Sequence, residues 1–168
     1  IVLKLSGHHG FIRLANPMHL LAIGTYAEPA DLILRSYWPS LITAGVFLLG
    51  VLYFGVGALR GRDRTGSFVL SMASLFAVGQ LVAEVSRGLF PYPYPLHDLR
   101  LVTIVLCSLG FGLCLAVHVI RRFRPGRPRL AFVAVALATL AAVLLVDSYD
   151  AKATLAMLGP VLLCAIDT

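Results

Sequence analysis

The sequence predicts an all-α integral membrane helical bundle, and two observations lead to this fold class. First, 59% of the 168 residues are hydrophobic and only 13% are charged, whereas soluble domains contain about 45–50% apolar and about 25% charged residues. Second, the apolar residues form long uninterrupted runs rather than the spacing of an amphipathic surface helix. Together these observations exclude an ordinary water-soluble globular domain.

Four full spans are predicted at about 39–59, 67–90, 99–120 and 130–146, followed by a partial fifth at 153–166. A helix of about twenty residues crosses a hydrocarbon core of ~30 Å, because each residue adds ~1.5 Å. The fifth run is shorter than this length. Small residues within spans let neighbouring helices approach closely. The predicted packing residues are Gly45, Gly50, Gly55, Ser108 and Gly112.

Residues 1–36 differ from the rest of the chain. Ile1, Leu3 and Leu5 recur at every second position, which predicts a half-buried strand, and 11–14 predicts a second one after a turn. A two-stranded ribbon is marginally stable alone, so we expect it to be the end of a larger extracytoplasmic β domain. The segment 16–35 is predicted to be a connector. The isolated ribbon and the short last run also predict a gene product longer than 168 residues.

The positive charge is concentrated between the apolar runs. The formal net charge is +6, and the 14 Lys and Arg residues include two arginine clusters: Arg60, Arg62 and Arg64, and then Arg121, Arg122, Arg124, Arg127 and Arg129. Clusters beside spans set topology and meet anionic lipid headgroups. No soluble basic face accompanies them, so we expect the lipid bilayer and no nucleic acid as partner. The positive-inside rule places both clusters in the cytoplasm and residues 1–36 outside.

Glu84 and Arg87 are predicted to form a polar pair near the end of the second span. They lie three positions apart, so they share one helix face and can offset each other's burial. The preferred interpretation is a structural pair. The alternative is a ligand-sensitive polar site that also includes Gln80.

No cofactor or metal is expected, although several residues were considered as ligands. His118 could hold a haem, a bacteriochlorophyll or a metal, but an isolated histidine at a membrane interface is the simpler interpretation. His8, His9 and His19 share the first segment without supporting cysteines or carboxylates. Cys107, Cys114 and Cys164 all lie in apolar runs and give no disulfide framework or zinc spacing. Catalytic motifs such as H-E-x-x-H and G-x-S-x-G are absent from the sequence, and we expect no enzyme.

Several residues resemble a known family of membrane receptors. Gly50 and Tyr53 occur in the first span, the short Arg62-Asp63-Arg64 hairpin follows, and Arg87 lies toward the end of the second span. This order, over about residues 10–165, resembles the membrane portion of bacterial seven-transmembrane receptors with diverse intracellular signalling modules. The resemblance implies a β-sandwich before the bundle, a bacterial inner membrane with a periplasmic N-terminal segment, and an output module after the last helix. This chain departs from the pattern, because it has fewer spans and no such module.

The leading functional hypothesis is a receptor-like membrane sensor domain that is not catalytic itself. A signal would change helix packing and reach a cytoplasmic output module outside this sequence. The glycine-rich first helix and the Glu84–Arg87 pair would contribute to such a two-state element. The alternative is a structural or accessory subunit of a photosynthetic or respiratory membrane complex, with other membrane subunits as partners.

Overall fold

The computed structural model describes residues 29–61, 63–89, 94–123 and 128–166, and its regular elements are all helices. The predicted ribbon at 1–14 lies outside the described residues. The five helices are α1 (Pro29–Arg60), α2 (Arg64–Leu89), α3 (Tyr94–Phe123), α4 (Pro128–Leu145) and α5 (Tyr149–Ile166). The helical bundle predicted from the apolar runs is therefore confirmed for this part of the chain.

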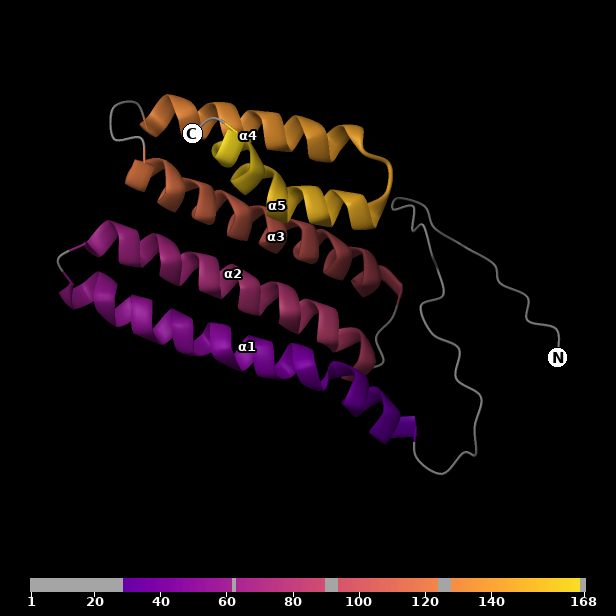
Figure 1. Ribbon diagram of the computed structural model, residues 1–168. Coiled ribbons are helices and arrows are strands. Elements are labelled where there is room, and N and C mark those ends of the chain that lie inside the picture. Colours follow the sequence, from indigo (N-terminus) through magenta and orange to yellow (C-terminus); the bar gives the residue numbers. More distant parts are fainter. Residues whose placement is uncertain (1–28, 62, 90–93, 124–127, 167–168) are drawn as a thin grey trace.

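The helices run up and down, so that successive helices are antiparallel (Figure 1). Their order in space is α1, α2, α3, α5, α4, because α5 inserts between α3 and α4 and packs against both. At one end of the bundle α1 and α3 finish and α2 and α4 begin. At the other end α2 and α4 finish and α1, α3 and α5 begin.

Three helices are long and apolar enough to cross a membrane, at Tyr37–Arg60, Arg64–Ser86 and Leu96–Phe123. Most of α1 also exposes large apolar side chains, which a bilayer would cover but water would not tolerate. The predicted fourth full span is not confirmed, because the described apolar stretch of α4, Phe132–Leu145, is too short. These features support a membrane protein with three candidate spans among the described residues.

The first helix begins earlier than the sequence predicted. We expected a connector as far as residue 35 and a helix from Pro39, but α1 begins at Pro29 and contains Pro39 in its interior. Pro29 fits the first helical position, where its missing N–H would have no partner. A proline inside a membrane helix is tolerated, although it removes one backbone donor. One turn further on, Thr43 Oγ1 donates a 2.8 Å hydrogen bond to the Pro39 carbonyl.

A glycine–serine seam joins α1 to α2; we define it as Gly50, Gly57, Ser67, Ser71 and Ser74. A Cβ on Gly50 would lie 2.9 Å from Ser74 Oγ, and one on Gly57 would lie 3.1 Å from Ser67 Oγ. Ser71 Oγ donates a 3.1 Å hydrogen bond to the carbonyl of Val51. The small side chains therefore let the two backbones approach closely, as membrane helices do when lipid offers no hydrophobic drive for association.

Two apolar clusters hold the other helices together. Toward the end where α3 finishes, Ala116 and Ile120 of α3 meet Val135 of α4 and Cys164 of α5. At the opposite end, Leu101 and Ile104 of α3 meet Tyr149 of α5, with Ala83 of α2 packed against them. The second cluster brings three helices to one point, and that point is where the polar groups described next are found.

Candidate functional site

Arg100 joins α3 to α2 at the end of the bundle where α2 finishes. It lies in the second turn of α3, and its Nη1 donates long hydrogen bonds to the carbonyls of Ala83, at 3.4 Å, and Glu84, at 3.3 Å. The Ala83 carbonyl also accepts a 2.8 Å bond from Ser86 Oγ. The Arg100 Nε is buried and has no partner in the described part of the chain. The Arg100 guanidinium is thus held by long hydrogen bonds to backbone carbonyls of α2, one of which also accepts from Ser86.

Tyr149 adds α5 to the same place. Its buried hydroxyl donates a 3.1 Å hydrogen bond to the carbonyl of Leu101, next to Arg100 in α3. The pKa of Tyr149 is raised to about 12, chiefly because the phenol is buried. The positive charge of Arg100 acts in the opposite direction, and the carboxylates of Asp150 and Glu84 add to the rise. The phenol therefore stays protonated and remains a donor at physiological pH. We call Arg100, Tyr149 and the Ala83 and Glu84 carbonyls the Arg100–Tyr149 joint.

The predicted Glu84–Arg87 pair remains a prediction. Glu84 is exposed and Gln80 is half-buried, while the side chain of Arg87 lies outside the described residues. The backbone of Glu84 does belong to the Arg100–Tyr149 joint, since its carbonyl accepts from Arg100 Nη1. The cation that the structure shows bonded to this part of α2 is therefore Arg100.

The predicted packing residues have different surroundings. Gly50 lies in the glycine–serine seam, and a Cβ on Gly55 would make only an ordinary 3.7 Å contact with Ser71. Ser108 is fully buried and donates to the carbonyl of Ile104. A Cβ on Gly112 would lie 2.6 Å from the carbonyl oxygens of Ala156 and Met157 in α5. Gly45 differs from the expectation, because it is exposed and a Cβ there would meet nothing within 4 Å. It lies on a face of α1 that turns away from α2.

Metal ligands do not converge anywhere in the described residues, where no group of three His, Cys, Asp or Glu side chains could hold an ion. His118 is half-buried near the end of α3. Cys107 and Cys114 are half-buried free thiols, and the side chain of Cys164 is buried. His8, His9 and His19 lie outside the described residues. The Arg100–Tyr149 joint instead contains a cation and a protonated phenol, and both donate hydrogen bonds that connect neighbouring helices.

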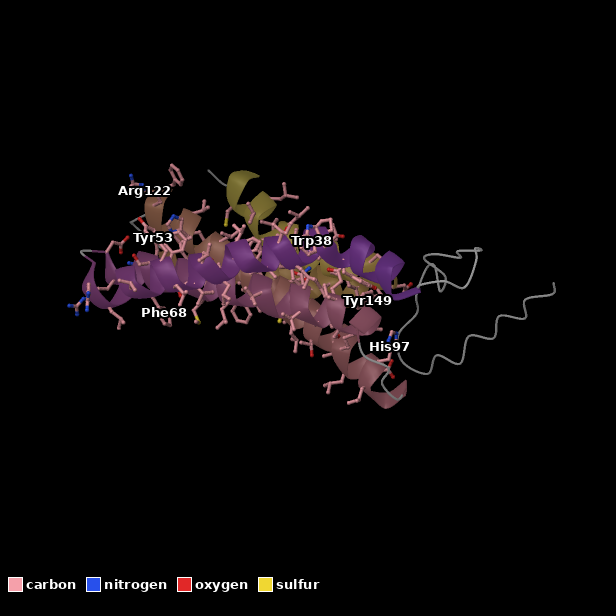
Figure 2. The ribbon with its side chains drawn as sticks, turned by 90° about the horizontal axis from the view of Figure 1, so that it is seen from below. Trp38, Tyr53, Phe68, His97, Arg122 and Tyr149 are labelled. Atoms are coloured by element: carbon pink, nitrogen blue, oxygen red, sulfur yellow. The ribbon has the colours of Figure 1, made fainter. Side chains whose placement is uncertain are left out.

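The arginines predicted to set topology gather at the opposite end of the bundle. Arg60, Arg64, Arg121 and Arg122 are all exposed, and they lie where α1 and α3 finish and α2 begins. The side chains of Arg62 and Arg124 lie outside the described residues. Figure 2 shows Arg122 at one end of the bundle and His97 and Tyr149 toward the other.

Three residues with notable environments were missed from sequence. Arg100 falls within the predicted third span at 99–120, and a charge inside an apolar run was the available signal. Tyr149 lies between the predicted runs 130–146 and 153–166, and no pattern in the sequence indicated that it would be buried. Thr139, fully buried in α4 with no partner for its hydroxyl among the described residues, carried no signal beyond its apolar surroundings.

These features define a helical membrane protein with a polar joint at one end and exposed arginines at the other. Comparison with protein-family models, with curated proteins and with solved structures finds no match. The resemblance to seven-transmembrane receptors therefore contributes to a proposal rather than to an assignment.

Proposed function

We propose that this chain is the membrane-embedded part of a receptor-like sensor, not catalytic in itself, that relays a signal through a change in helix packing. The signal acts at the end that carries the Arg100–Tyr149 joint. The change in packing reaches the arginine end, which faces the cytoplasm of a bacterial cell across the inner membrane. An output module of the larger protein or complex would respond there.

The observation that carries this proposal is the weakness and position of the joint. The Arg100 bonds to Ala83 and Glu84 are 3.3–3.4 Å long and its Nε is unpartnered among the described residues, whereas strong N–H···O bonds are about 2.9–3.0 Å. We therefore infer that the made and broken states of this joint differ little in free energy, because long hydrogen bonds contribute little. A signal can therefore shift its equilibrium with a modest difference in affinity for the two states.

A relay makes a specific prediction about distance. In a chain with Cys107, Cys114 and Cys164 replaced by alanine, spin labels at Leu59→Cys and Phe123→Cys report the separation of α1 and α3 at the arginine end. Both positions are exposed. Arg100→Gln, or Tyr149→Phe at the same joint, is expected to shift this separation by about 1–2 Å or to add a second population, as helix shifts in switching proteins do. Pulsed electron resonance in lipid nanodiscs measures the distance.

Lys152→Gln is the matched control, because it removes a cation from the same end without touching the described joint. It is expected to leave the 59–123 distance unchanged. If Arg100→Gln alters distances only at its own end and leaves the 59–123 pair as in the parent chain, the joint is a local fastening and the relay proposal is wrong.

The second candidate is a structural or accessory subunit of a photosynthetic or respiratory complex. The observation that favours it is the outer side of α1, whose most apolar stretch contains no buried residue and where Gly45 lies open. Gentle detergent extraction from native membranes separates the two roles. Stoichiometric copurification with haem- or pigment-bearing subunits would support the accessory role, whereas purification without them would support the sensor.

A further inference from the structure

Four exposed arginines from three helices form one surface at the end of the bundle opposite the Arg100–Tyr149 joint. We call this surface the arginine end and define it as Arg60, Arg64, Arg121 and Arg122. The up-and-down path of the chain brings the α1–α2 hairpin and the end of α3 to the same level (Figure 1). Arginines far apart in sequence thus lie at the same end of the bundle.

The charge of this surface is not neutralised within the described residues. Asp63 is the acid closest to the cluster in sequence, and its Oδ1 accepts a 2.9 Å hydrogen bond from the Gly66 N–H at the start of α2. Aspartate is a favoured cap at that position, so its carboxylate is engaged with the helix. None of the four arginines forms an ion pair with another described residue. An anion from outside the described chain can therefore approach them.

The position of the arginine end relative to the membrane indicates which anion can reach it. The candidate span in α1 ends at Arg60, the one in α2 begins at Arg64, and the one in α3 ends at Phe123. Leu59 and Phe123, beside Arg60 and Arg122, are 77% and 68% exposed. Guanidinium groups next to exposed apolar side chains at the end of a span lie at the level of lipid phosphates.

We propose that the arginine end selectively binds anionic phospholipid headgroups. The guanidinium group matches a phosphate in shape and charge and can donate two parallel hydrogen bonds to it. We expect the opposite end to lack this preference, because the acids Glu84, Asp98, Asp147 and Asp150 outnumber the cations Arg100 and Lys152 among the side chains that the structure describes there. The lipid selectivity is independent of the proposed sensor role.

Tryptophan quenching by brominated lipids tests the proposal at both ends of the same molecule. Trp38 is the single tryptophan of the chain and is exposed near the start of the α1 span (Figure 2). The double variant Trp38→Phe/Phe123→Trp moves the reporter to the arginine end. Each protein is reconstituted into phosphatidylcholine vesicles that contain one fifth phosphatidylglycerol, with bromine on one lipid or the other.

With the tryptophan moved to position 123, brominated phosphatidylglycerol is expected to bind about fivefold more strongly than phosphatidylcholine for each arginine that contacts a headgroup. With the tryptophan at its original position 38, the ratio is expected to stay near one. Replacing all four arginines with glutamine should bring the ratio at position 123 to about one, and replacing them with lysine should keep most of it, since charge dominates the attraction. High salt should weaken the preference, because exposed charges are screened.

Equal quenching by the two brominated lipids at position 123 would overturn the proposal, and so would a preference that survives the four glutamine replacements. If soluble glycerol phosphate at millimolar concentration abolishes the preference for brominated phosphatidylglycerol, the arginines bind soluble phosphates rather than lipid headgroups. Should the fourfold variant fail to fold, Arg121→Gln/Arg122→Gln gives the same test with half of the charge removed, and Lys152→Gln is its control at the opposite end.

Discussion

Replacing Gly112 with alanine is expected to lower the melting temperature of the bundle more than the same change at any other described helix-interior glycine. A Cβ at this position would lie 2.6 Å from the carbonyl oxygens of both Ala156 and Met157, and 3.1 Å from Cγ of Pro160. These are backbone atoms and a ring of α5, so they can move only if α5 moves away from α3. Such overpacking costs about 1–3 kcal/mol, more than the gain of at most about 1 kcal/mol from replacing a helical glycine with alanine.

Two further glycines calibrate this effect. Gly45→Ala meets nothing within 4 Å, so it should leave the melting temperature unchanged or raise it slightly. Gly110→Ala would meet the ring of Phe76 at 2.8 Å, and we expect an intermediate loss, because a side chain can turn where a backbone cannot. Thermal unfolding in detergent, followed by circular dichroism, ranks the three variants. Equal melting temperatures for the Gly112 and Gly45 variants would show that α3 and α5 do not pack closely.

The contrast between Gly45 and Gly112 also shows the limit of what the sequence predicts. The apolar runs located α1, α2 and α3 because about twenty apolar residues in a row have few alternatives to a helix in a membrane. The same runs are apolar on all sides. Lipid is as apolar as the interior of the bundle, so hydropathy cannot tell which face of a helix turns inward. Gly45 and Gly112 were therefore predicted as equivalent, although one faces open space and the other α5.

The Arg100–Tyr149 joint was unpredictable for a related reason. Hydropathy and the arginine clusters predicted where the helices end, and the ends of α1 and α3 and the start of α2, which carry the described arginines of both clusters, lie at one end of the bundle. The joint, however, depends on α5 inserting between α3 and α4, which brings Tyr149 to the carbonyl of Leu101, forty-eight residues away. Nothing local to either residue specifies that order of helices.

Replacing Thr139 with valine is expected to raise the melting temperature, which is the opposite of what most core substitutions do. The Thr139 side chain is fully buried in α4 against Gly159 of α5, and its Oγ1 has no hydrogen-bond partner among the described residues. A buried hydroxyl without a partner costs about 1–3 kcal/mol, whereas an apolar group of the same shape costs nothing of this kind. Valine keeps the β-branched shape that suits the rotamer in a helix.

Thr154→Val is the matched control, because Thr154 lies in α5, is exposed, and donates its hydroxyl to the carbonyl of Asp150 at 2.8 Å. This change removes a satisfied bond at the surface, so its effect should be small and unfavourable. The same thermal unfolding in detergent compares both variants with the parent chain. A lower melting temperature for Thr139→Val would mean that the hydroxyl has an acceptor in the folded protein. The close packing of α4 on α5 would then depend on a polar contact, and the expectation of stabilisation would be wrong.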